Sequence, residues 1–257
     1  MDESLIELLK SKDESTRNEA VERIAGEIDD DLADALLDLA GNDEGEDIRA
    51  DALMALGPAV ELAGDEYGFL DEDGDPDAFT QPPLTREGFR HVVERLRALY
   101  EDTSQPTIVR RRAFEVLVRD PQPWHRETVR SLAQSGDRDW MLTAIFAMGQ
   151  MAGFDAEIIE AVKTQEDDSL LEAVRAAGRQ GVREAAPKIG DLARSEDTEI
   201  ELRIAAILAL PGVDQASGEI LDALLDHSDA EIAAAASDAL DEMELYGGFE
   251  DDEDEEE

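Results

Sequence analysis

Residues 48–57 have the sequence IRADALMALG, and residues 202–210 have the similar sequence LRIAAILAL. Both stretches place apolar side chains three or four positions apart, which is the spacing of one face of an α-helix. Both also carry an alanine at the centre of that face, Ala52 and Ala206. The two stretches therefore predict helices that pack closely through a small residue.

The same pattern recurs along the chain with a period of about 30 residues and one longer gap. The seven central alanines are Ala20, Ala52, Ala113, Ala144, Ala173, Ala206 and Ala236. A second apolar-periodic stretch precedes each of them, so that each unit is a helix, a turn and a helix. Such units grow by stacking, because each buries its core against its neighbours. We predict an all-α fold, a right-handed α-solenoid of about seven two-helix repeats over residues 1–246.

The repeat resembles a known type. Residues 48–57 resemble the second helix of the short HEAT repeats of the phycobilisome-lyase type, and residues 202–210 match it nearly as well. The signatures of ankyrin and tetratricopeptide repeats are absent. The resemblance covers about 200 residues and implies a fold rather than an activity. It also implies that one arginine per repeat joins neighbouring repeats through acidic turn residues. These arginines are Arg17, Arg49, Arg110 and Arg203. Met141, Leu170 and Ala233 stand at this position in the fourth, fifth and last repeats, where we expect the ladder to be interrupted.

Helix ends and interruptions are also predicted from local signals. Gly57, Gly149, Gly178 and Pro211 directly follow the last apolar position of a repeat, so we expect them to end helices. The expected N-cap residues are Asp13, Asp137, Asp229, Glu166 and Glu199.

Residues 61–84, rich in glycine, proline and acid, predict an inserted loop. Residues 247–257 end in eight consecutive acids and predict a disordered tail.

The composition is strongly acidic, with 23 basic and 66 acidic residues and a net charge of −43. Only four of the basic residues are lysine. Acid-rich, lysine-poor surfaces suit a protein that stays soluble in molar salt, where charge repulsion is screened over about 3 Å. The chain also resembles, as a whole, a family of stand-alone HEAT-repeat proteins, through residues 110–113 (RRRA), 124–125 (WH) and 139–140 (DW). Together with the composition, this resemblance suggests a protein of a halophilic archaeon. We therefore expect a salt-rich cytoplasm and a fold that tightens as salt is added.

Several function classes are disfavoured by composition. The chain has no cysteine, which excludes disulfides, thiolate metal sites and cysteine nucleophiles. Its start is unlike a secretory signal, and its longest clean apolar run, Ile204 to Leu210, is too short to span a membrane. Repeats of this kind also form deoxyhypusine hydroxylases, whose iron site needs His-Glu pairs. None occurs here, and the three histidines are scattered. We predict no cofactor, no metal site and no membrane partner.

Residues 86–138 are the exception to the acidic character, since they hold eleven arginines and eight acids. Both tryptophans of the chain lie in this region or directly after it. Planar arginine donors beside aromatic rings suit carboxylates, phosphates and stacked rings. The candidate binding residues are Arg111, Arg112, Trp124, His125, Arg126 and Arg130. Core packing for the aromatic residues and repeat-to-repeat bridging for the arginines remain the alternatives.

We predict a non-catalytic protein-interaction scaffold or adaptor with a protein partner. Nucleic-acid binding through the same arginines is a second class, although the net charge opposes a polyanion. The third is an oxidoreductase or lyase activity of the repeat family, for which no catalytic constellation is visible.

Overall fold

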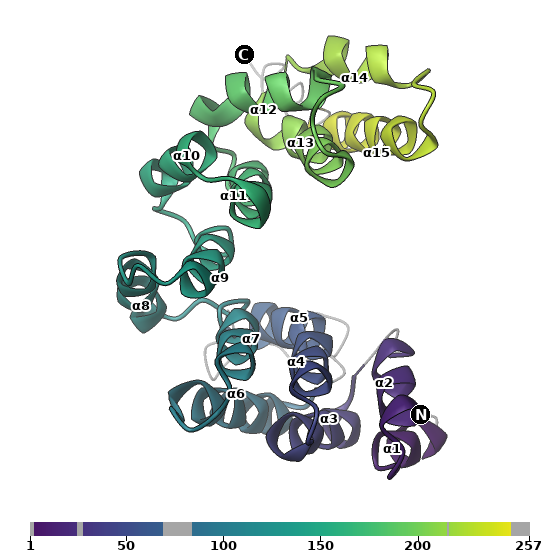
Figure 1. Ribbon diagram of the computed structural model, residues 1–257, viewed down its shortest axis with the longest axis vertical. Coiled ribbons are helices and arrows are strands. Elements are labelled where there is room, and N and C mark those ends of the chain that lie inside the picture. The colour runs from purple at the N-terminus through teal and green to yellow at the C-terminus, as the bar shows by residue number, and fades with distance from the viewer. Residues whose placement is uncertain (1–2, 25–27, 69–83, 215, 248–257) are drawn as a thin grey trace, which may run out of the picture. The chain divides into compact units, whose positions relative to one another are not determined.

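The structure is a computed structural model. It describes residues 3–24, 28–68, 84–214 and 216–247. Over these ranges the chain forms α-helices and one short 3₁₀ helix, without a β-strand. The chain divides into two compact units, Met1–Glu127 (unit 1) and Thr128–Glu257 (unit 2), and each is described by itself. Figure 1 labels the helices along both units.

Unit 1 holds the first seven helices. They are α1 (Glu3–Leu9), α2 (Glu14–Glu22), α3 (Asp30–Asn42), α4 (Glu46–Ala55), α5 (Gly57–Gly68), α6 (Arg86–Glu101) and α7 (Thr107–Leu117). The next helix, α8 (Pro123–Ala133), crosses the boundary between the units.

Unit 2 holds the remaining elements. They are α9 (Arg138–Met148), α10 (Asp155–Thr164), α11 (Asp167–Arg179), the 3₁₀ helix η1 (Arg183–Ala185), α12 (Ala186–Arg194), α13 (Ile200–Val213), α14 (Gly218–Leu224) and α15 (Ala230–Gly247).

Seven helix pairs account for all but one of the described α-helices. The pairs are α1/α2, α3/α4, α6/α7, α8/α9, α10/α11, α12/α13 and α14/α15, and α5 is the additional helix. The second helix of each pair carries one of the seven alanines. The predicted all-α architecture of about seven two-helix repeats is confirmed.

The alanine register is confirmed by burial. All seven alanines have an exposed fraction of 0%. Successive second helices pack against each other, as in α4 against α7 and in α9, α11, α13 and α15 in turn. A larger side chain at these positions would separate the helices, because protein interiors are close-packed.

Two of the four predicted helix stops are confirmed. Gly149 caps α9, and Gly57 directly follows Leu56, the C-cap of α4, and begins α5. Gly178 lies in the last turn of α11 and Pro211 lies inside α13, so neither ends its helix. Close packing explains two of the glycines. A Cβ on Gly178 would lie 2.8 Å from the Cα and Cβ of Ala209, and one on Gly149 would lie 3.1 Å from those of Ala176. These glycines therefore allow neighbouring second helices to touch.

The predicted aspartate N-caps accept capping hydrogen bonds through their side chains, whereas the predicted glutamate N-caps do not. The carboxylate of Asp13 accepts a hydrogen bond from the Thr16 amide at 2.9 Å, and Asp137 accepts from two first-turn amides. Asp229 accepts from the Glu231 amide at 2.9 Å. Glu166 and Glu199 occupy the N-cap position without a capping hydrogen bond from the side chain. The aspartate side chain has the short reach that an N-cap needs, and the glutamate side chain is longer.

The predicted loop at residues 61–84 is wrong for its first part, since residues 61–68 belong to α5. Pro58 is compatible with the first turn of a helix, and Ala59, Val60 and Ala63 bury one face of α5. Leu84 is also buried. Residues 69–83 and 248–257, including the predicted acidic tail, lie outside the described residues.

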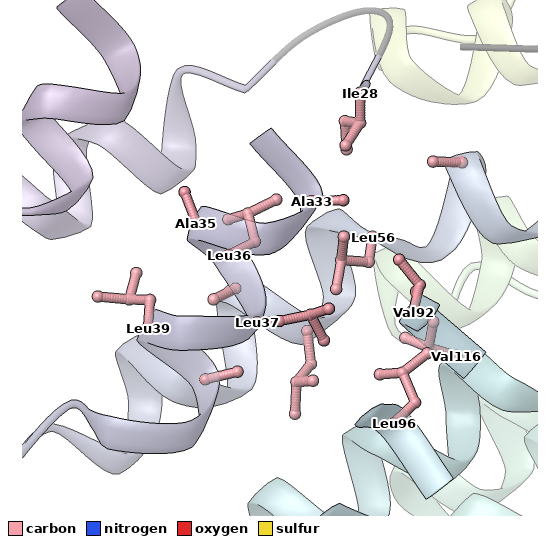
Figure 2. Packing of buried hydrophobic residues seen from close by; sticks show 14 of the residues in the cluster. Ile28, Ala33, Ala35, Leu36, Leu37, Leu39, Leu56, Val92, Leu96 and Val116 are labelled. Atoms are coloured by element: carbon pink, nitrogen blue, oxygen red, sulfur yellow. The ribbon is translucent and has the colours of Figure 1, made fainter. Parts of the chain in front are cut away.

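The core of unit 1 joins side chains from several repeats. Figure 2 shows Leu37, Leu56, Val92, Leu96 and Val116 from successive elements of this cluster, and each is at most 1% exposed. Burying a side chain of this size contributes about 1.5–3 kcal/mol. In unit 2 the largest fully buried aliphatic side chains are Ile145, Ile158, Ile189 and Ile207.

The four bridging arginines share one contact. Each donates to a backbone carbonyl at or just after the end of the first helix of its own repeat, where such carbonyls lack a helical partner. The pairs are Arg17 with Ser11 (3.0 Å), Arg49 with Ala40 (2.7 Å), Arg110 with Tyr100 (3.0 Å) and Arg203 with Ala193 (3.0 Å).

The expected bridge to the next repeat is confirmed with an acid in one case. Arg17 meets Asp43 in the following turn at 2.5 Å. The pKa of Asp43 is lowered although burial opposes the shift, because Arg17 and two backbone amides stabilise the carboxylate. Arg49 donates to Gln105 instead, and Arg203 meets Glu196 of its own turn and His227 of the next.

Candidate binding surface

The six predicted site residues lie on two helices. Helix α7 carries Arg111 and Arg112, and α8 carries the other four. Arg130 falls in unit 2, whereas the other five belong to unit 1. Two members, Arg111 (6% exposed) and His125 (1%), are buried. These two side chains therefore lie below the surface that the sequence analysis assigned to them.

Arg111 and Arg112 share one buried carboxylate. Glu115, one helical turn further along α7, is 2% exposed. Its Oε1 lies 3.9 Å from Arg111 Nη2, and its Oε2 lies 2.5 Å from Arg112 Nη1. Arg111 and Glu115 are four positions apart on the helix, a spacing at which opposite charges attract. Glu115 therefore neutralises part of the positive charge of the two arginines within the protein.

An aromatic cluster surrounds the start of α8. Trp124 lies 6.3 Å from Tyr100 and 6.1 Å from Phe114 between ring centroids. Tyr100 and Phe114 are 4.8 Å apart, and Phe114 meets His125 edge to face at 5.6 Å. Because Phe114 is fully buried and Trp124 is partly exposed, the cluster connects the core of unit 1 to its surface.

Arg97 of α6 completes this cluster, although the sequence analysis did not select it. Its guanidinium carbon lies 5.1 Å from the centre of the Trp124 ring, within the range of a cation–π interaction. Its Nε donates to Glu101 at 2.8 Å, and its side chain remains 55% exposed. The contact joins residues 27 positions apart. No local pattern links positions so distant, so only the fold brings this pair together.

His125 has a structural role at the N-terminus of α8. Its Nδ1 accepts a hydrogen bond from the Gln122 amide at 2.9 Å. A side chain in the first turn that reaches back to this amide acts like the glutamate of a capping box. Pro121 and Pro123 flank Gln122 and donate no backbone hydrogen bond, so this amide is the donor available there.

Burial, together with the positive charge of Arg97, lowers the pKa of His125 to about 4. The imidazole is therefore neutral at physiological pH. Since Nδ1 accepts, the proton of the neutral ring is assigned to Nε2. Among the described residues Nε2 has no hydrogen-bond acceptor.

Arg130 belongs to a second, smaller group in unit 2. Its guanidinium carbon lies 5.2 Å from the Phe154 ring centre, and its Nε lies 3.8 Å from Glu157. The side chain of Arg130 is 49% exposed, so this group lies at the surface.

Three other arginines of residues 86–138 also have acidic neighbours. Arg95 lies 3.4 Å from Asp38, Arg119 lies 2.7 Å from Glu61, and Arg138 lies 2.9 Å from Asp167. Most of the positive charge of residues 86–138 is therefore paired with carboxylates.

The part of the chain that the structure describes contains no group of three or more acidic or histidine side chains placed to hold a metal ion. None of its helices has the length and apolar character needed to cross a membrane.

No family model matches the chain, and no curated protein matches it. The chain is similar to several solved structures, three of which follow. An engineered protein is 21% identical, covers 94% of this chain and 96% of its own, and has a TM-score of 0.39. YibA of Escherichia coli is 16% identical with coverages of 95% and 92% and a TM-score of 0.45. Human deoxyhypusine hydroxylase in complex with glycerol is 12% identical with coverages of 94% and 95% and a TM-score of 0.38. Because these TM-scores are low, the fold of this chain is established by its own helices and not by these similarities.

Proposed function

We propose that this chain is a non-catalytic protein-interaction scaffold that binds a protein partner through the aromatic cluster of unit 1. The observation that carries the proposal is the exposed guanidinium of Arg97 over the ring of Trp124. Tryptophan and arginine are the residues that most often dominate binding energy at protein interfaces.

The cluster is held in place before any partner arrives. Tyr100 and Phe114 support the Trp124 ring, and His125 fixes the first turn of α8. A preorganised surface loses less conformational entropy on binding. Arg97 offers planar donors for a carboxylate, and Trp124 offers an apolar face beside them. The partner segment we propose therefore places an acidic side chain next to an apolar one. Arg112, at 35% side-chain exposure, and the exposed Arg126 supply further positive charge in the same unit.

Binding is favoured over the two other function classes. The ion pairs of Arg95, Arg119 and Arg138 divide the basic region, whereas a nucleic acid requires a continuous basic surface. An enzyme would need a nucleophile or base at the surface, and the histidine of this cluster is buried and caps a helix. We also place the protein in the cytoplasm of a halophile, on the strength of its acidic, lysine-poor composition.

The test is partner capture in molar KCl by wild-type protein and three variants, followed by direct binding of the captured protein. Arg97→Glu and Trp124→Ala remove the two central groups. Arg90→Glu, an exposed arginine on the same helix, is the matched control for the charge change. We expect wild type and Arg90→Glu to bind, and the other two to lose at least about tenfold in affinity.

Equal binding by all four proteins, with equal helix content, contradicts the proposal. Retention of a single-stranded DNA probe that Arg97→Glu abolishes would move the function to nucleic-acid binding.

A further inference from the structure

Unit 2 presents an apolar surface that the proposed function does not use. The position two residues before the central alanine is Leu142 in α9, Leu171 in α11 and Ile204 in α13, and all three are partly exposed. The equivalent residue in α7 of unit 1 is Arg111, which is buried. The same register position is thus apolar and accessible in three consecutive second helices of unit 2.

Helix α13 extends this surface along its axis. Ile200 and Leu208, four positions either side of Ile204, are 42% and 43% exposed. Residues at this spacing lie on one face of a helix. Four large apolar side chains of the described residues are strongly exposed, and two of them lie on this face. We call Leu142, Leu171, Ile200, Ile204 and Leu208 the unit-2 apolar face.

Packing between the helices brings these side chains into one surface. The helices α9, α11 and α13 lie side by side in unit 2 (Figure 1). Helices in contact have axes about 8–10 Å apart, so the row across the three helices is about 16–20 Å long. Arg138 of α9 meets Asp167 of α11 at 2.9 Å, and Arg175 of α11 meets Glu201 of α13 at 3.3 Å. These ion pairs join each helix to the next.

Acidic residues line one edge of this face. The position five residues before the central alanine is acidic and exposed in all four second helices of unit 2. These residues are Asp139, Asp168, Glu201 and Glu231. At 100° per residue, this position lies about 60° around the helix from the apolar row. The row of acids therefore runs beside the apolar row, at the N-terminal ends of the helices.

We propose that the unit-2 apolar face binds an amphipathic helix of a partner protein, with basic residues along one flank. The length of the apolar row matches about 11–13 residues of helix. The acidic edge selects the opposite charge, because like charges across an interface are strongly unfavourable. Unit 1 contains an internal example of such docking. There α5, the helix outside the repeat pairing, packs on α7, and Glu61 of α5 forms an ion pair with Arg119, which lies two residues beyond the end of α7.

The site shares no residue with the aromatic cluster of unit 1, so the two proposals fail independently. The probe is a labelled helical peptide of about 14 leucine and lysine residues with an amphipathic pattern. A peptide of the same composition in scrambled order and a leucine–glutamate peptide of the same pattern are the controls. Binding is followed by fluorescence anisotropy in molar KCl, and hydrogen exchange locates the contact.

We expect the amphipathic lysine peptide to bind at least about tenfold more tightly than the scrambled peptide and to protect α11 and α13 from exchange. Its preference over the leucine–glutamate peptide should widen as the salt concentration is lowered, because molar salt screens exposed charges. The double variant Ile200→Asp with Leu208→Asp should lose about tenfold or more in affinity. Leu62→Asp, which changes an exposed leucine of unit 1 (52% exposed), should leave affinity within about twofold.

Three results overturn the proposal. Equal binding of the three peptides would remove the chemistry that it assigns to the partner. An equal effect of Leu62→Asp would show attraction by the whole protein rather than by this face. Concentration-dependent self-association that Ile200→Asp with Leu208→Asp abolishes would assign the face to a second copy of this chain.

Discussion

Helices α7 and α13 occupy the same place in their repeats but present opposite chemistry beside the shared alanine. Two residues before and after Ala113, α7 has Arg111 and Glu115, both buried and 3.9 Å apart. At the same positions α13 has Ile204, partly exposed, and Leu208, 43% exposed. The polar pair is inside and the apolar pair is outside, contrary to the usual partition.

The comparison shows that packing of the alanine face and the chemistry of the positions beside it are independent in a second helix. The face that contains the alanine packs within its own unit, in a helix that contacts neighbouring second helices, as α7 contacts α4 and α13 contacts α11 and α15. This face is alike in both helices. The neighbouring positions are limited only by what encloses them, so they hold a buried ion pair in unit 1 and exposed apolar side chains in unit 2. The following predictions test this independence, from the largest expected effect to the smallest.

Removing the buried carboxylate should have the largest effect on unit 1. Glu115→Gln leaves Arg111 buried without its counter-charge, and breaking a buried pair in this way costs about 3–5 kcal/mol of unfolding free energy. The measurement is denaturant unfolding in molar KCl. Fluorescence of Trp124, in a Trp140→Phe background, confines the signal to unit 1.

The double variant Arg111→Leu with Glu115→Leu gives α7 the apolar chemistry of α13. Replacing a buried ion pair by apolar side chains is often neutral or stabilising, so most of the lost free energy should return. If the double variant is as unstable as Glu115→Gln, these positions are not exchangeable between the units.

Acid should weaken unit 1 through His125. Its pKa is about 4 in the folded protein, below the ordinary value of 6.5 that applies to the unfolded chain. The unfolded chain therefore takes up a proton first as the pH falls from 6.5 to 4, and stability decreases across this window. The loss approaches about 3 kcal/mol at the acid end.

The test of this pH effect compares wild type with His125→Gln, which keeps a hydrogen-bond acceptor but does not titrate. The wild-type stability should fall more steeply between pH 6.5 and 4 by the amount given above. Parallel pH profiles for the two proteins would show that His125 titrates normally.

Overpacking at the alanine register should affect both units alike. Ala113→Leu in unit 1 and Ala144→Leu in unit 2 each add bulk at a position with an exposed fraction of 0%, and each should cost about 1–3 kcal/mol. The control is Ala234→Leu in α15, at the exposed position two residues before its central alanine. A cost confined to one unit would disprove a common packing rule.

The smallest effect is expected for the exposed ion pair of unit 2. The side chains of Arg138 and Asp167 are 74% and 71% exposed, so Arg138→Gln should change the unfolding free energy by less than about 1 kcal/mol. Thermal unfolding in low and molar salt would measure it. A larger change would mean that the ion pairs between second helices, and not only the buried alanine face, hold unit 2 together.

The sequence by itself determined the repeat. The four bridging arginines were expected from the resemblance to short HEAT repeats. The spacing of the seven alanines and the short N-caps at Asp13 and Asp137 are consequences of helical periodicity and local hydrogen bonding. Those properties depend on residues within a few positions of one another, so they are visible in one chain. The all-α class and the two-helix unit followed from them.

Only the tertiary structure decided which side chains beside the alanine face are exposed. His125 is buried as a cap and Arg111 lies inside next to Glu115, whereas Arg97 reaches Trp124 from another helix. Residues 61–68 form a helix because a buried surface was available for Ala59, Val60 and Ala63. Exposure depends on the segments that fold over a residue, and these come from other repeats. No local spacing contains that information, and for this reason the repeat was predictable from the sequence and its binding surface was not.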